Sequence, residues 1–187
     1  MDSNTSGGSS KFDINGNDIV APNDSTFAAI YLHMADDHLA DVSISDNQIY
    51  DAFNTGIVGS GIRVAIDGAG SKYLDHLLIA NNTIRSQKSC LSIESTGEVT
   101  NLSISDNIFE AGTAGTILDP ARPVFVQAAT NGSASANNHD IVVTGNAFHH
   151  GDGCRFESLS EIPFENVTIT GNVFDIMNQI APESVWG

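Results

Sequence analysis

Six segments of the chain repeat one pattern of apolar and polar positions around a shared asparagine. In each segment, apolar residues stand five and three positions before the asparagine, and another stands two positions after it. The six asparagines are Asn17, Asn47, Asn82, Asn107, Asn146 and Asn172. They lie 30, 35, 25, 39 and 26 residues apart, and repeat periods in this range are typical of solenoid folds.

The pattern inside each segment predicts two short strands with a sharp bend between them. Apolar positions spaced by two lie on one face of a strand. The residue just before each shared asparagine is glycine, aspartate or asparagine, and these types accept the left-handed backbone that a tight bend needs. We therefore expect one strand to end at the asparagine and a second to begin directly after it.

A third strand is predicted in most intervals between the segments, over 29–34, 61–66, 90–94, 123–127 and 154–158. Three short strands per turn predict an all-β protein, a right-handed parallel β-helix of about six coils. Stacked coils would align the asparagines into a ladder whose amides bond to one another and to buried backbone. An up-and-down barrel does not explain one asparagine column with apolar residues at fixed offsets.

The β-helix is expected to cover residues 12–175, with different segments at its two ends. Residues 1–11 are polar and predict a flexible N-terminal segment that leaves the first coil open. Residues 176–187 carry apolar side chains and predict a C-terminal cap or a subunit contact, because the last coil of a solenoid needs cover.

Charge and composition exclude several classes of partner. The chain carries 7 Lys+Arg against 23 Asp+Glu, a formal net charge of −16, which disfavours nucleic acid and anionic lipid as partners. Its 41% hydrophobic and 16% charged residues argue against disorder. No apolar run is long enough for membrane insertion, and the first ten residues lack the features of a secretory signal.

The two cysteines are predicted to be free thiols. Cys90 and Cys154 begin predicted strands two coils apart. That separation is about 10 Å, beyond the ~7 Å limit between the Cα atoms of a disulfide.

The repeat φ-x-I-x-[GDN]-N-x-[IF] resembles that of the pectin-lyase-like superfamily of parallel β-helix proteins, which includes polysaccharide lyases, hydrolases, epimerases and phage tailspike depolymerases. The resemblance covers residues 12–175 and implies a carbohydrate-active module that binds and cleaves an extracellular or cell-surface polysaccharide, as hydrolase or lyase. It implies an extracellular or virion-associated location. Asp36, Asp37 and His38 lack the proline and the final glutamate of the epimerase motif.

The alternative is a non-catalytic glycan-binding or virion structural module, similar to a tailspike or fibre segment. Such a module is expected to form a homotrimer or to attach to a further domain at its N-terminal end. In either case, the resemblance implies that ligands bind on the outer face of the sheet built from the third strands.

Alternation along these third strands predicts two outward columns. The first column is Tyr31, Arg63, Ser92, Phe125 and Arg155, and the second is His33, Ala65, Glu94, Gln127 and Glu157, with Asp67 just beyond. From these columns the candidate catalytic residues are Glu94, Glu157, Arg63 and Arg155. The candidate substrate-binding residues are Tyr31, His33, Asp67, Phe125, Gln127, His150 and Asp152.

Two interpretations of the outward columns stay open. Glu94 and Glu157 share a column, about 10 Å apart along the backbone, and inverting glycosidases hold their carboxylates about 6.5–9.5 Å apart. Equally, Arg155 and Glu157 could form an ordinary surface ion pair. His150 and Asp152 could serve acid–base chemistry, bind a metal, or simply be solvated in a glycine-rich turn. No metal ligands are assigned, and calcium is the expected cofactor if one offsets the negative charge.

Overall fold

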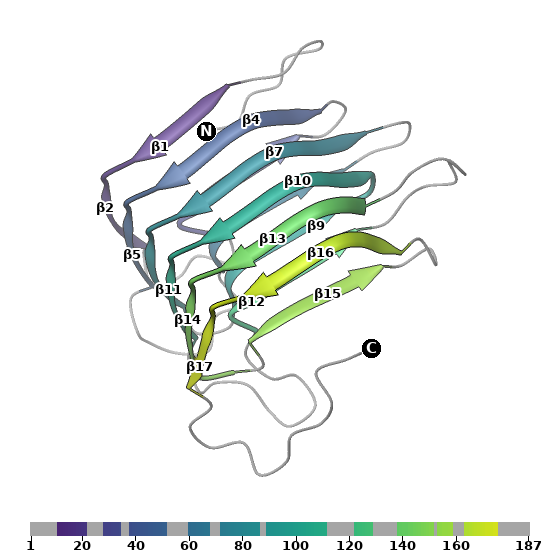
Figure 1. Cartoon of the computed structure of the whole chain (residues 1–187). Helices are drawn as coiled ribbons and strands as arrows, with labels where there is room; N and C mark the ends of the chain where they lie inside the picture. The colour runs from purple at the N-terminus through teal and green to yellow at the C-terminus, as the bar shows by residue number, and fades with distance from the viewer. Residues whose placement is uncertain are drawn as a thin grey trace.

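The computed structural model describes residues 11–21, 28–34, 38–51, 60–67, 72–86, 89–111, 122–128, 138–151, 153–158 and 163–175. Within these ranges every regular element is a β-strand, and all strand pairs are parallel. The strands wind as a right-handed parallel β-helix, as the repeat predicts. Figure 1 shows the coils stacked in chain order, from purple β1 to yellow β16 and β17.

Three sheets run along the helix. Sheet A contains β1 (Phe12–Asn15), β4 (Leu39–Ser45), β7 (Tyr73–Ala80), β10 (Glu98–Ser105), β13 (Asn138–Thr144) and β16 (Phe164–Thr170). Sheet B contains β2 (Asp18–Ala21), β5 (Gln48–Asp51), β8 (Thr83–Ser86), β11 (Ile108–Ala111), β14 (Ala147–His149) and β17 (Val173–Asp175). Sheet C contains β3 (Ile30–Met34), β6 (Ser60–Ile66), β9 (Ser89–Ser95), β12 (Val124–Ala128) and β15 (Cys154–Ser158).

The asparagine ladder forms at the bend between sheets A and B. At all five steps, the backbone N–H and the side-chain Nδ2 of one asparagine donate to Oδ1 of the next, at 2.9–3.0 Å. Nδ2 also donates to a carbonyl of the preceding coil, for example from Asn107 to Ile79 at 2.9 Å. The ladder therefore satisfies amides that would be costly to bury alone.

The bend itself is left-handed in every coil, as predicted. The residues before the ladder asparagines have φ between 55° and 69°, and they are Gly16, Asp46, Asn81, Asp106, Gly145 and Gly171. Glycine, aspartate and asparagine are the types that adopt this conformation at the lowest cost.

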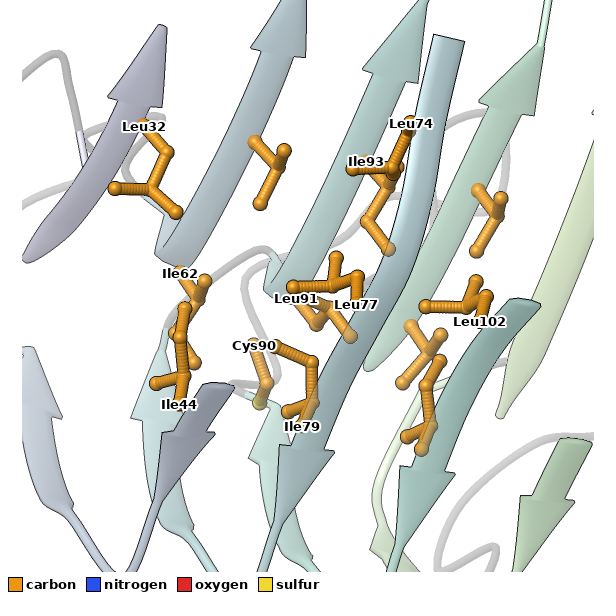
Figure 2. Packing of buried hydrophobic residues seen from close by; sticks show 14 of the residues in the cluster. Leu32, Ile44, Ile62, Leu74, Leu77, Ile79, Cys90, Leu91, Ile93 and Leu102 are labelled. Atoms are coloured by element: carbon orange, nitrogen blue, oxygen red, sulfur yellow. The ribbon is translucent and has the colours of Figure 1, made fainter. Parts of the chain in front are cut away.

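The core is a column of aliphatic and aromatic side chains enclosed by the three sheets. Figure 2 shows Leu32, Ile62 and Leu91 of sheet C meeting residues such as Ile44 and Leu77 of sheet A. Sheet B adds a stack of phenyl rings, in which Phe109 and Phe148 lie 5.4 Å apart and Phe148 and Phe174 lie 4.9 Å apart. The core-facing columns predicted from the sequence are thus confirmed.

Core-facing side chains become exposed in the C-terminal coil. Val143 and Phe148 are 0% and 2% exposed, whereas Ile169 and Phe174, one coil later in the same columns, are 42% and 46% exposed. The predicted flexible segment up to residue 10 and the predicted cap over 176–187 lie outside the described residues.

Both cysteines are free, as predicted. Cys90 is buried, and its thiol lies 3.4 Å from the Ile84 carbonyl oxygen. Burial raises the pKa of both thiols, that of Cys154 to about 12. The two thiols therefore stay protonated at neutral pH.

Candidate ligand-binding face

The outward face of sheet C carries the two predicted columns in the predicted register. Tyr31 pairs with Arg63, Arg63 with Ser92, Ser92 with Phe125, and Phe125 with Arg155. The second column runs in the same register, through His33, Ala65, Glu94, Gln127 and Glu157. Nine of these side chains belong to types that form polar or aromatic contacts, and we name this surface the sheet C face.

An ion pair crosses the middle of the sheet C face diagonally. Arg63 and Glu94 lie on neighbouring strands in different columns, and Nη2 of Arg63 donates to Oε2 of Glu94 at 2.8 Å. The other two corners of this square are the small residues Ala65 and Ser92, which are 1% and 4% exposed although they point outward. Their small size allows the long side chains to meet above them.

Glu94 is held by a second donor. The Ser92 hydroxyl donates to Oε1 at 2.8 Å, so each carboxylate oxygen accepts one hydrogen bond. A carboxylate oxygen has a further lone pair available as an acceptor. Glu94 therefore presents a fixed anionic group with room for further donors.

Aromatic rings flank this ion pair on the first coil. The Tyr31 and His33 rings stack with 5.5 Å between centroids and an interplanar angle of 8°. The Arg63 guanidinium lies 5.5 Å from the Tyr31 ring centroid. Nε2 of His33 lies 3.0 Å from Oδ2 of Asp67, so these candidates form one connected group.

A second polar group lies on the fourth and fifth coils. The Arg122 guanidinium lies 5.2 Å from the Phe125 ring centroid, and Arg155 and Glu157 approach to 3.5 Å on one strand. Gln127 stands in register between Glu94 and Glu157. The structure thus keeps the two glutamates two strands apart in one column and pairs each with an arginine.

The remaining two candidates lie elsewhere. His150 follows β14 in a left-handed conformation, with φ of 64°, and its backbone N–H donates to the Asp175 carbonyl oxygen at 3.1 Å. It therefore belongs to the turn between sheets B and C rather than to the two outward columns. Asp152 lies outside the described residues.

A second column of left-handed residues, which sequence reasoning missed, bends the strands of sheet A. Its members have φ between 51° and 58° and are Asp41, His76, Asn101, Asp140 and Asn166. Between β4 and β7, Ala40 pairs with Asp75 and Val42 with Leu77, so Asp41 and His76 drop out of the pairing. Each member stands six positions before a ladder asparagine, and this spacing is the signal that could have revealed the column.

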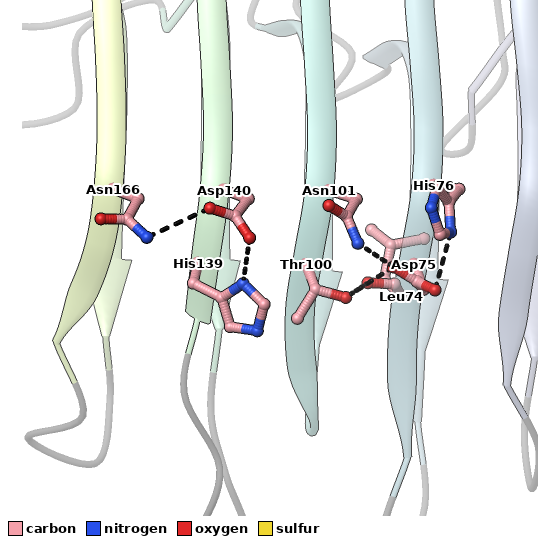
Figure 3. A network of polar contacts seen from close by, with 8 residues as sticks. All are labelled: Leu74, Asp75, His76, Thr100, Asn101, His139, Asp140 and Asn166. Atoms are coloured by element: carbon pink, nitrogen blue, oxygen red, sulfur yellow. Dashed lines mark hydrogen bonds and ion pairs between the residues drawn. The ribbon is translucent and has the colours of Figure 1, made fainter.

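Two clusters of hydrogen-bonded polar side chains lie on this bend (Figure 3). In the first, Oδ1 of Asp75 accepts hydrogen bonds from Thr100 and Asn101, and Oδ2 lies 2.8 Å from Nδ1 of His76. In the second, Asp140 contacts His139 and accepts a hydrogen bond from Asn166 at 3.1 Å.

The carboxyl groups of this bend have perturbed acidities. Burial works to raise the pKa of Asp75, but the hydrogen bonds from Asn101 and Thr100 and the neighbouring His76 outweigh it and hold the pKa below its usual value. The hydrogen bonds from His139 and Asn166 lower the pKa of Asp140. Both side chains therefore act as anionic acceptors that tie neighbouring strands together.

We expect Asp75→Asn to make the free energy of unfolding depend less on pH under acidic conditions. A carboxyl group with a lowered native pKa stabilises the protein above its unfolded pKa, about 3.9, and that contribution is lost as the pH falls through the native pKa. Urea unfolding from about pH 2 to 7 should show a smaller pH-dependent loss for the variant. Asp41→Asn, at an exposed site on the same bend, is the control, and a wild-type pH profile for Asp75→Asn would contradict the assignment.

Comparisons with known proteins give no relative for this chain. No family model, no curated protein and no solved structure matches it. Among the described residues, no group of three or more His, Cys, Asp and Glu side chains is placed to hold a metal ion, and calcium binding stays a prediction. No helix in the described part of the chain is long and apolar enough to cross a membrane.

Proposed function

We propose that this protein is a carbohydrate-active β-helix module that binds an extracellular or cell-surface polysaccharide on the sheet C face. The observation that carries the proposal is the square built by Arg63, Glu94, Ala65 and Ser92, flanked by the Tyr31 and His33 rings. Sugar hydroxyls both donate and accept hydrogen bonds. A guanidinium beside a fixed carboxylate can therefore donate to one sugar hydroxyl while the carboxylate accepts from its neighbour.

The width of the face supports a polymer as the ligand. Its two polar columns cross five strands, which at about 4.8 Å per strand gives roughly 19 Å. Sheet B also carries an arginine–glutamate pair, Arg85 with Glu110, and Arg85 lies 5.9 Å from the Tyr50 ring centroid. In its adjacent outward column, however, sheet B is polar only on the first three coils and apolar on the last three, so its second polar column is shorter than that of the sheet C face. This column reads Asp18, Gln48, Thr83, Ile108, Ala147 and Val173.

Cleavage is a second candidate function, favoured by the two glutamates in one column. Glu94 is held as an acceptor by Arg63 and Ser92, which suits a base or a nucleophile, whereas Glu157 stands beside Arg155 at the longer distance of 3.5 Å. Gln127 lies between the two glutamates in the column, so they are two strands apart, which leaves space between them for a glycosidic bond. The repeat's resemblance to pectin-lyase-like proteins supports a hydrolase or lyase at an extracellular or virion surface, and the non-catalytic tailspike-like module is its alternative.

The binding proposal predicts a large effect of Arg63→Ala. Removing the guanidinium leaves Glu94 without its ion-pair partner and removes the donor group, so polysaccharide affinity should fall about tenfold or more. Affinity electrophoresis and calorimetry against a panel of polysaccharides measure this. Arg85→Ala removes the analogous pair on sheet B and is the matched control, which should bind as the wild type does.

Equal losses in both variants, or no binding by the wild type across the panel, would contradict the proposal. Turnover is tested separately, by reducing-end release for a hydrolase and by unsaturated-uronate absorbance for a lyase. Glu94→Gln and Glu157→Gln should each abolish any such activity, and activity that survives both substitutions excludes this pair.

A further inference from the structure

We propose that the sheet C face selects an uncharged glycan rather than a polyanionic one. This inference rests on the proposed function and names its substrate class. For the cleavage candidate it favours the hydrolase, because a lyase that releases unsaturated uronates needs a uronate substrate. It follows from how the charges on this face are paired, and it concerns a protein whose overall charge is strongly negative.

The charges in the two columns of the sheet C face balance one another. The columns hold two arginines, Arg63 and Arg155, and two carboxylates, Glu94 and Glu157. With His33 counted as neutral, the formal charge of the columns is zero, in a chain whose net charge is −16. At the edges of the face, Arg122 lies against the Phe125 ring, and Lys72 donates to the backbone oxygen of Asp67 at 2.8 Å.

A polyanion meets two obstacles on this face. The Glu94 carboxylate already holds Nη2 of Arg63 by a 2.8 Å charge-assisted hydrogen bond. A ligand carboxylate that takes the remaining N–H donors of Arg63 must therefore lie beside Glu94 or displace it, and one guanidinium then serves two carboxylates. Beyond contact distance, the surplus negative charge of the protein repels the polymer within about one Debye length, roughly 8–10 Å at moderate salt.

An uncharged glycan needs no such displacement. Its hydroxyls can donate to the remaining lone pairs of the Glu94 carboxylate while Arg63 and Ser92 keep their bonds. The Tyr31 and His33 rings lie beside the Arg63 guanidinium. Their faces offer apolar surface for a sugar ring to pack against without adding net charge. The Arg63–Glu94 pair therefore discriminates by charge, because Glu94 can accept hydroxyl donors but repels a second carboxylate.

The test compares polyuronates with the same polymers after chemical reduction of their carboxyl groups, using several backbones. For at least one backbone, the reduced and uncharged polymer should bind the wild-type protein about tenfold or more tightly than its polyuronate parent. Its affinity should change less than about twofold between roughly 50 and 500 mM salt, because no charge is neutralised on binding.

Binding to polyuronates alone, with affinity that falls as salt rises, would overturn this inference and leave the proposed function standing. Binding to neither kind of polymer would overturn both. The two failures are thus distinguished in one experiment.

A variant pair tests the mechanism of selection directly. Glu94→Gln frees the Arg63 guanidinium, and polyuronate binding that weakens with salt should appear or strengthen about tenfold. Glu110→Gln frees Arg85 on sheet B in the same way, where no glycan face is proposed, and should gain nothing. A gain in both variants would show that any released arginine suffices, and no gain in either would show that the Glu94 pairing does not set the charge preference.

Discussion

Replacing Asn107 by leucine is expected to destabilise the protein by about 3–5 kcal/mol, because it removes one rung from a buried ladder. Asn107 is 1% exposed, and its Oδ1 accepts from both the backbone N–H and Nδ2 of Asn82. Its Nδ2 donates to the Ile79 carbonyl. Leucine fills the space but leaves the buried Asn82 N–H without its acceptor and removes the Asn107 donor from the Ile79 oxygen.

Denaturant unfolding at neutral pH measures this loss, and the same substitution at the end of the ladder is its control. Asn17 is exposed and belongs to the first coil, so Asn17→Leu should cost about 1 kcal/mol or less. If both variants lost the same stability, the ladder's contribution would not depend on burial, and unsatisfied buried amides could not be the cause of the loss.

Gly97→Ala is expected to cost about 3 kcal/mol or more, because the backbone of the neighbouring coil occupies the space that a side chain would need. A Cβ atom at position 97 would lie 2.0 Å from the backbone oxygen of Lys72. That oxygen also accepts the Glu98 N–H at 3.0 Å, so neither strand can withdraw without losing the pairing of β7 with β10. Overpacking that the structure cannot relax is among the most damaging single changes.

A second glycine separates crowding from backbone conformation. Gly16 has φ of 67°, but a Cβ there would meet no atom within 4 Å, so Gly16→Ala should cost only about 1–2 kcal/mol. Thermal and urea unfolding of the two variants provide the comparison. A larger loss at position 16 than at position 97 would mean that the left-handed bend, and not the close approach of coils, limits substitution.

Much of the fold could be predicted from the sequence because one short pattern repeats with fixed offsets. Asn47, its preceding Asp46 and its inward Ile44 recur as one unit in the other coils, and period-two alternation then fixes which residues of β6 and β9 face outward. The column of left-handed residues through His76 and Asn101 was missed because aspartate, asparagine and histidine inside a strand resemble surface residues, and only their fixed spacing from the ladder asparagines marks the bend.

Side-chain pairing on the sheet C face could be predicted only in part. Register alone places Arg63 opposite Ser92, yet its guanidinium bonds diagonally to Glu94. That choice depends on the small volume of Ala65, which a one-dimensional pattern does not convey. Arg122 precedes a strand and so has no place in the alternation, and only its position against the Phe125 ring reveals that it belongs to this face.

The ladder has a direction, and this makes the coil an interchangeable unit of growth. Every amide donates to the next asparagine along the chain and accepts from the one before it, whether the chain between them is 25 or 39 residues long. The first and third strands of successive coils keep their register across the same differences in length. A duplication that copied one whole coil would therefore add one asparagine whose donors and acceptor match those of both neighbouring coils. Gene-level repeats of about 25 residues can thus lengthen this molecule one coil at a time while its core packing stays the same.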